Sequence, residues 1–346
     1  MDRLKTNALE GMKKHNVVGF SMTLWDEFGT AATRSYGFLD AEGREPVQAE
    51  SRFNACSISK MAAALLAMKL TAEGRIGLDD PVNERLQGWK CQVGHAGDEG
   101  RITLRQLLSH HSGIRDGEDS FDIGRDDAPP PSMTDILRGK TVYMSQPIVV
   151  GAEPGGAFHY SDAGYCVAQK YMEDCCGKPF DVLMSEKVLE PLGMSLSSYE
   201  SSLSIAAKSG YASGHDRTGT RTEPRYPCYP FAAAAGLWST PSDLAKLAME
   251  VIQSLRGTGK LGLSKSLVEE MLTPQGQTDF AGLGLFLSGQ EGRRIVSSYG
   301  WGVGFQSMMV FSPELGKGAA LMQNTDTGRH QREGLIGEML EGLGWT

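Results

Sequence analysis

The sequence has no excess of positive charge. Among its 346 residues, 34 lysines and arginines stand against 42 aspartates and glutamates, which gives a formal net charge of −8 at pH 7. Nucleic acids and anionic membranes bind basic surfaces, so this balance disfavours both as partners. We therefore expect the partner to be a small molecule.

Long apolar segments are also missing. The densest one, residues 61–68, is far shorter than the roughly 20 apolar residues that a membrane-spanning helix needs. The first seven residues show neither the apolar core nor the cleavage site of a signal peptide. We expect no membrane span and a cytoplasmic location, or an extracytoplasmic one if a leader has been removed.

Cysteine and histidine patterns are sparse. The six cysteines are few and irregularly spaced for a chain of this length, and no CxxC pair or HExxH motif occurs. We therefore expect no disulfide scaffold, no metal site and no cofactor. A GxSxG motif is absent too, which disfavours a histidine triad built on His110, His111 or His159.

Hydrophobic patterns divide the chain into three parts. Residues 17–38 and 282–323 alternate short apolar runs with turns, as strands do, whereas the middle of the chain is mainly helical and rich in loops. This order predicts an α+β or α/β fold, in which one antiparallel sheet, flanked by helices, is assembled from both ends around a helical insertion. The expected domains are 1–56 with 231–346, and 57–230, with the site between them.

Individual elements can be placed by their ends. Thr103 and Thr240 precede helical patterns as N-caps, and Gly74 and Gly177 follow such patterns as stop signals. The stretch 115–132, with six aspartates and glutamates up to residue 127 and three consecutive prolines, predicts a solvated acidic loop. The other expected elements are an N-terminal helix, helices at 57–73, 162–176, 240–255 and 330–343, and strands at 282–287, 294–298, 306–311 and 319–323.

The sharpest chemical feature is Ser57-x-x-Lys60 at the start of the apolar helix. Three residues along a helix bring two side chains onto one face, so the Lys60 amine can reach the Ser57 hydroxyl. Burial penalises the charged form of a lysine, and a neutral Lys60 can take the proton of Ser57 and generate a nucleophile. The plain alternative is that Ser57 caps the helix and Lys60 is solvated.

Five ordered segments extend this motif into a family resemblance. Residues 107–113 read LLSHHSG and residues 154–165 read PGGAFHYSDAGY. With the SxxK helix, they resemble the serine β-lactamase and penicillin-binding-protein superfamily, and class C β-lactamase-like hydrolases in particular. The matching segments are residues 75–82, 102–113, 154–165, 190–194 and 235–240.

The resemblance assigns roles to two further residues. Tyr160 falls where the family has a catalytic tyrosine, and a phenol near a cationic lysine can share in proton transfer. Asp162 departs from the family pattern, which usually has asparagine there. An ionised aspartate only accepts hydrogen bonds, so Asp162 either alters substrate recognition, caps the following helix or pairs with Lys60.

The third family motif has lost its cation. In the stretch YGWGVGF, Trp301 occupies the position of the usual lysine or histidine, and this stretch resembles the W-G-G motif of family VIII carboxylesterases. The resemblance implies that Gly302 and Gly304 let a substrate approach the strand, and that an N–H near Gly304 joins that of Ser57 in an oxyanion hole. The missing cation argues against substrates that carry a carboxylate at this position.

Together these residues predict a serine hydrolase. Ser57 would form an acyl-enzyme, Lys60 with Tyr160 would move protons, and Asp162, Trp301, Gly302 and Gly304 would contact the substrate, most readily a carboxylic ester or a neutral amide. Alternatives are a D-amino-acid-specific peptidase or amidase, a D-Ala-D-Ala carboxypeptidase, a β-lactamase, and an inactive penicillin-binding-like sensor. The oligomeric state is not predicted.

Overall fold

The computed structural model describes residues 3–27, 31–93, 101–117, 120–121, 130–200, 202–206, 208–290 and 292–345. The helices are α1 Arg3–His15, α2 Ser59–Ala72, α3 Val82–Arg85, α4 Leu104–Leu108, α5 Met133–Leu137, α6 Asp162–Cys176, α7 Phe180–Met184, α8 Glu190–Leu192, α9 Ser202–Ala206, α10 Ala232–Ala235, α11 Pro241–Leu255, α12 Lys265–Met271 and α13 Leu335–Gly342. Two 3₁₀-helical turns are η1 Cys56–Ile58 and η3 Gln331–Glu333, and one π-helical turn is η2 Ser185–Leu189. The strands are β1 Gly19–Trp25, β2 Ala31–Gly37, β3 Phe53–Asn54, β4 Gln92–Val93, β5 Val149–Val150, β6 Ser198–Tyr199, β7 Leu237–Ser239, β8 Phe286–Gln290, β9 Arg293–Gly302, β10 Phe305–Ser312 and β11 Lys317–Gln323.

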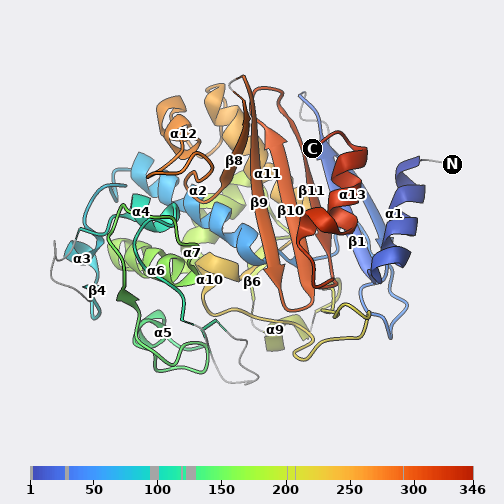
Figure 1. Cartoon of the computed structure of the whole chain (residues 1–346), viewed down its shortest axis with the longest axis horizontal. Helices are drawn as coiled ribbons and strands as arrows, with labels where there is room; N and C mark the ends of the chain where they lie inside the picture. The colour runs from blue at the N-terminus through green and yellow to red at the C-terminus, as the bar shows by residue number, and fades with distance from the viewer. Residues whose placement is uncertain are drawn as a thin grey trace.

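A six-stranded antiparallel sheet is built from both ends of the chain. Its order is β2-β1-β11-β10-β9-β8, so the N-terminal hairpin pairs with the last strand of the C-terminal part, with Phe20 opposite Gln323. This arrangement confirms the predicted sheet and the helices that flank it (Figure 1). The domain boundaries expected from the sequence stay a prediction.

The sheet lies between two layers of helices. Successive side chains of β10 belong to two different clusters, because neighbouring residues of a strand point to opposite faces of the sheet. Met308 and Val310 pack with α1 and α13 in one cluster, whereas Met309 and Phe311 join the larger core on the other face, where α2 and α11 lie. Figure 1 shows α1 and α13 on one side of the sheet and helices such as α2, α4, α6 and α12 on the other.

Helix α2 is the centre of the larger core. Eleven of its fourteen residues are buried, from Ser59 to Met68 and at Leu70, so the helix is covered on nearly every face. It follows the turn η1 directly, and a small sheet of β3, β7 and β6 lies next to this turn. The position of Ser57 is therefore set by a helix that is packed into the core.

Several predicted ends differ from the observed ones. The predicted strand 282–287 is wrong over its first four residues, because Gly284 has a φ of +77° and β8 begins only at Phe286. The predicted strand 294–298 continues to Gly302. The closing helix is split, since Gly334 is extended and separates η3 from α13.

Two further sequence predictions concern the surface. Most of the acidic stretch 115–127 lies outside the described residues, but Asp116 is described and is not a freely solvated side chain, as shown below. No helix in the described part of the chain is both long and apolar enough to cross a membrane. A cytoplasmic location stays a prediction.

Candidate active site

The turn that carries Ser57 is held in an unusual backbone conformation. Cys56 has a φ of +49°, in the left-handed region that residues with a Cβ seldom adopt. The Asn54 side-chain oxygen accepts the Cys56 N–H at 2.7 Å, and Ser59 Oγ donates to the Cys56 carbonyl at 2.6 Å. These two bonds fix the turn and present Ser57 at the start of α2.

Lys60 reaches Ser57, as the SxxK spacing predicts. Its Nζ donates to Ser57 Oγ at 2.9 Å and to the Ala234 carbonyl at 3.0 Å. The side chain of Lys60 is only 4% exposed. The alternative of a solvated lysine in the first turn of the helix is therefore wrong.

The carboxylate of Asp162 pairs with Lys60. Asp162 Oδ1 lies 2.5 Å from Lys60 Nζ, and the Asp162 side chain is 23% exposed. The N-cap of α6 is Ser161, whose side chain accepts from the Gly164 N–H, so Asp162 does not cap the helix. Of the three roles that the sequence left open for Asp162, the structure shows the pairing with Lys60.

This ion pair reverses the expected charge state of Lys60. Burial lowers the pKa of Lys60, as expected, but the neighbouring Asp162 carboxylate and Tyr160 raise it by more, so that its pKa lies above the usual value for lysine. In the free protein the pairing with Asp162 therefore favours the charged form of Lys60, against the neutral form that burial alone favours.

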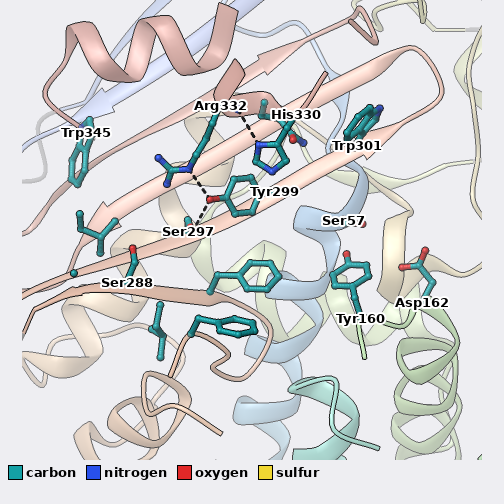
Figure 2. A pocket seen from close by; sticks show the side chains of 16 residues that line it. Ser57, Tyr160, Asp162, Ser288, Ser297, Tyr299, Trp301, His330, Arg332 and Trp345 are labelled. Carbon is teal, nitrogen blue, oxygen red and sulfur yellow. Dashed lines mark hydrogen bonds between the residues drawn. The ribbon is translucent and has the colours of Figure 1, made fainter. Parts of the chain in front are cut away.

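Tyr160 completes the group around Ser57. Figure 2 shows its hydroxyl directed at Ser57, and Lys60 Nζ lies 4.9 Å from the centre of its ring. The residue as a whole is 42% exposed, because the outer part of the ring borders open space. Burial of the hydroxyl raises the pKa of Tyr160, although the Lys60 cation opposes the shift, so the phenol keeps its proton near neutral pH.

Two residues that the sequence did not assign hold this group in place. Asp116 accepts from Ser161 Oγ at 2.8 Å and from the backbone N–H groups of Asp162 and Ala163 at 2.8 and 3.0 Å. His110 Nδ1 accepts the Ser161 N–H at 3.1 Å. Its ring stacks on that of Tyr160 at 4.4 Å. The start of α6 is thus clamped from two sides.

The sequence contains both residues of this clamp, but no motif marks their role. His110 belongs to the LLSHHSG segment, and Asp116 follows it by six residues. The spacing of the two residues matches no catalytic motif, because both side chains bind the backbone of residues 161–163. Backbone acceptors and donors have no signature in a single sequence.

The end of β9 faces the Ser57 turn. Strand β8 pairs with β9 only as far as Ser297, and no other described strand pairs with the rest of that edge. Gly300 packs so closely here that a Cβ would lie 2.2 Å from the Ala55 carbonyl oxygen. Only glycine therefore lets β9 approach the chain two residues before Ser57.

The three residues predicted from the third motif lie in different places. Trp301 is 45% exposed, lines the cavity in front of Ser57 and donates its Nε1–H to Asp326 at 2.9 Å. Gly302 lies against Tyr229 and Cys56, where a Cβ would meet their side chains. Gly304 is in the turn after β9 and packs on Gly214. An oxyanion hole that uses an N–H near Gly304 stays a prediction.

A cavity of about 870 Å³ opens in front of Ser57. Tyr160 and Asp162 border one end, and the cavity continues along β9 past Tyr299 to Trp345 near the C-terminus (Figure 2). Its volume is in the range that holds a small organic ligand. Neither Gly302 nor Gly304 is among its lining residues.

Other cysteine and aromatic side chains near the site have structural roles. Cys56 is 1% exposed, and burial raises its pKa, so the thiol is protonated and inert. Tyr211 and Phe231 are core residues, 5% and 1% exposed, and do not line the cavity. In the described part of the chain, no group of three or more histidine, cysteine, aspartate or glutamate side chains could hold a metal ion.

The buried His110 predicts a pH-dependent stability. Burial, then the Lys60 cation, lower the pKa of His110 well below its usual value, so the folded protein cannot bind the proton that the unfolded chain takes up near pH 6.5. The stability present above pH 6.5 is therefore lost as the pH falls. His110→Asn removes the titration and keeps an acceptor, and asparagine tolerates the φ of +63° found here.

We expect urea unfolding to show a smaller loss of stability between pH 7.5 and 5.5 in His110→Asn than in the unmodified protein. His111 and His215, whose pKa values are also lowered, first of all by burial, will leave a remaining slope. An identical pH dependence in both proteins would contradict the assignment of a neutral His110.

Curated relatives resemble this chain over part of their length. Protein flp of Staphylococcus aureus is 24% identical over 249 residues, which cover 70% of this chain and 45% of the relative. Unguisins hydrolase ungD of Aspergillus violaceofuscus is 26% identical over 249 residues, which cover 68% of this chain and 42% of the relative. The chain thus matches less than half the length of these relatives.

Solved structures show the same fold over nearly the whole chain. The octameric penicillin-binding protein homologue from Pyrococcus abyssi has a TM-score of 0.78 at 25% identity, with 99% of this chain and 78% of that chain covered. The D-amino acid amidase from Ochrobactrum anthropi SV3 has a TM-score of 0.74 at 20% identity, with 99% and 98% covered, which shows the fold alone. Finally, the family described as Beta-lactamase matches residues 4–342, and the chain therefore belongs to this family of serine hydrolases.

Proposed function

We propose that the protein hydrolyses small carboxylic esters or neutral amides through an acyl-enzyme on Ser57. The observation that carries the proposal is the hydrogen bond from Lys60 Nζ to Ser57 Oγ at 2.9 Å, beside which the Tyr160 hydroxyl is directed at the same serine. A serine hydroxyl becomes a nucleophile when a neighbouring group can take its proton. The cavity in front of this group provides room for the substrate.

The proposed reaction has two halves. Ser57 Oγ attacks the substrate carbonyl carbon, its proton moves to the Lys60–Tyr160 pair, and the pair returns a proton to the leaving alcohol or amine as the acyl bond to Ser57 forms. Water then attacks the acyl carbon, gives a proton to the pair, and Ser57 recovers its hydroxyl proton as the acid leaves. Because Lys60 is charged at rest, it must first pass its own proton to Asp162 or to solvent before it can accept another.

The substrate class follows from the groups at the cavity mouth. Trp301 stands where the family resemblance places a cation, and its indole N–H is already bonded to Asp326. This position therefore offers no positive charge to a substrate carboxylate, and an uncharged ester or amide fits it better. Its aromatic face supplies an apolar contact instead.

A second candidate is an amidase or peptidase for substrates with a free amine. Asp162 lines the cavity and presents a carboxylate beside Ser57, which can accept a hydrogen bond from an ammonium group. Solved relatives of the same fold include a D-amino acid amidase complexed with L-phenylalanine amide and SurE with D-Leu. Comparing D-alanyl amides with acetyl esters as substrates separates this candidate from the first.

Ser57→Ala should lower kcat/KM for nitrophenyl acetate and butyrate by at least about a thousandfold, because no acyl-enzyme can form. Cys56→Ala is the matched control, since the neighbouring thiol is buried and unused. We expect the control to keep activity within a few-fold. Retention of most activity by Ser57→Ala would sink the mechanism.

Asp162→Asn should shift the pH dependence of kcat/KM. The Asp162 charge raises the pKa of Lys60 and burial lowers it, so removing the charge leaves burial and lowers that pKa. More Lys60 is then neutral at pH 7 to 8, the acidic limb moves to lower pH, and activity there rises by about tenfold for each pKa unit.

Asp326→Asn is the control for this measurement, because Asp326 binds the Trp301 indole and forms no ion pair with Lys60 in the described structure. Its acidic limb should stay in place. If Asp162→Asn loses activity at every pH and its acidic limb does not move, the neutral Lys60 is not the base, and Asp162 takes part in proton transfer itself.

A further inference from the structure

The cavity has a second end that the proposed reaction does not use. From Ser57 it follows β9 past Tyr299 to Arg332 and Trp345, as Figure 2 shows. Its walls between these ends are apolar, formed by Phe286, with Phe280, Leu287 and Ile295. A substrate that occupied the whole cavity would therefore need an apolar body and a group that suits the far end.

Tyr299 and Arg332 together offer hydrogen atoms at the far end. Arg332 donates Nε–H to the Tyr299 hydroxyl oxygen at 3.0 Å, and Ser297 Oγ donates to the same oxygen at 3.4 Å. Because this oxygen already accepts two bonds, its own hydrogen is free to be donated. The two terminal nitrogens of the Arg332 guanidinium have no hydrogen-bond partner among the described residues.

His330 adds a third donor. Its Nδ1 accepts the backbone N–H of Arg332 at 3.3 Å, and this bond places the ring hydrogen of the neutral side chain on Nε2. The ring lies 5.3 Å from that of Tyr299 and lines the same cavity. Three side chains at this end of the cavity thus present hydrogen atoms to it. The oxygen of Tyr299 and Nδ1 of His330 already accept hydrogen bonds from the protein.

The cavity has a carboxylate at one end and a guanidinium at the other. Arg332 makes no ion pair with a carboxylate within the described part of the chain, and Asp162 is the one carboxylate among the lining residues, at the opposite end. A guanidinium that has no ion-pair partner among the described residues and lies next to two further hydrogen-bond donors suits a carboxylate, often with two parallel hydrogen bonds.

We propose that Tyr299, His330 and Arg332 form a subsite for a carboxylate that the substrate carries on an apolar chain or ring, remote from the carbonyl attacked by Ser57. The inference rests on the proposed function for the identity of the reacting end. It assigns the substrate class more narrowly, as an ester or amide whose far end is an acid. The carboxylate can belong to the acyl part or to the leaving group.

Binding without turnover tests the subsite directly. In the Ser57→Ala protein, we would titrate a series of phenylalkanoates and the matching primary amides, and follow binding by calorimetry. The carboxylate of at least one chain length should bind about 10- to 100-fold more tightly than its amide, and this preference should weaken with added salt. Arg332→Gln should abolish the preference, and Tyr299→Phe should reduce it.

Arg329→Gln is the matched control. It removes the same charge three residues away, from an exposed side chain that does not line the cavity, and should leave the preference intact. Equal binding of acids and amides, or equal losses in Arg329→Gln and Arg332→Gln, would overturn the subsite.

Kinetics on the protein with Ser57 intact separate the two proposals and the two sources of the carboxylate. Nitrophenyl half-esters of dicarboxylic acids place the charge on the acyl part, and carboxyphenyl esters place it on the leaving group, each compared with its methyl ester. Cleavage of all of them at similar rates overturns the subsite alone. Failure to cleave any ester, with the binding preference present, overturns the proposed reaction and leaves the subsite standing.

Discussion

The buried contact between Lys60 and Ser57 is the interaction on which the rest of the site depends. An ammonium group taken out of water needs partners, and Lys60 has three: the Ser57 hydroxyl, the Ala234 carbonyl and the Asp162 carboxylate. These partners come from η1, α10 and the start of α6. One cation therefore joins three separate elements around the nucleophile, and any change in its charge alters the position and reactivity of Ser57 together.

Hydrogen bonds around the site hold the partners of Lys60 in place. Asp116 and His110 hold the backbone next to Tyr160 and Asp162, so neither side chain can withdraw from Lys60 without breaking several hydrogen bonds. The burial that makes an unpaired lysine costly is outweighed by the carboxylate, and the pKa of Lys60 is raised. Asp162 thus favours the protonated form of Lys60, at a position where the family resemblance predicts a base.

The sequence predicted the fold and the closeness of Lys60 to Ser57, because both depend on local patterns, whereas the catalytic roles of Ser57, Lys60 and Tyr160 stay a prediction. Alternation along β10 and β11, and the spacing from Ser57 to Lys60, translate directly into geometry. It failed where the decisive partner is distant or is backbone: the charge of Lys60 depends on Asp162, the clamp of Asp116 acts on N–H groups, and Arg332 meets Tyr299 across 33 residues. Gly304 was placed near the substrate by its motif, whereas the tight turn puts it against Gly214.

The central claim is that Ser57 carries the acyl group. Intact-mass spectrometry after rapid acid quenching, with a short-chain ester, a D-alanyl amide and a penicillin as separate reagents, followed by peptide mapping, tests it most directly. The account predicts an acyl adduct from the ester on the peptide that contains Ser57, and none in Ser57→Ala. Ester cleavage without any adduct on that peptide, or an adduct that persists in Ser57→Ala, would contradict it.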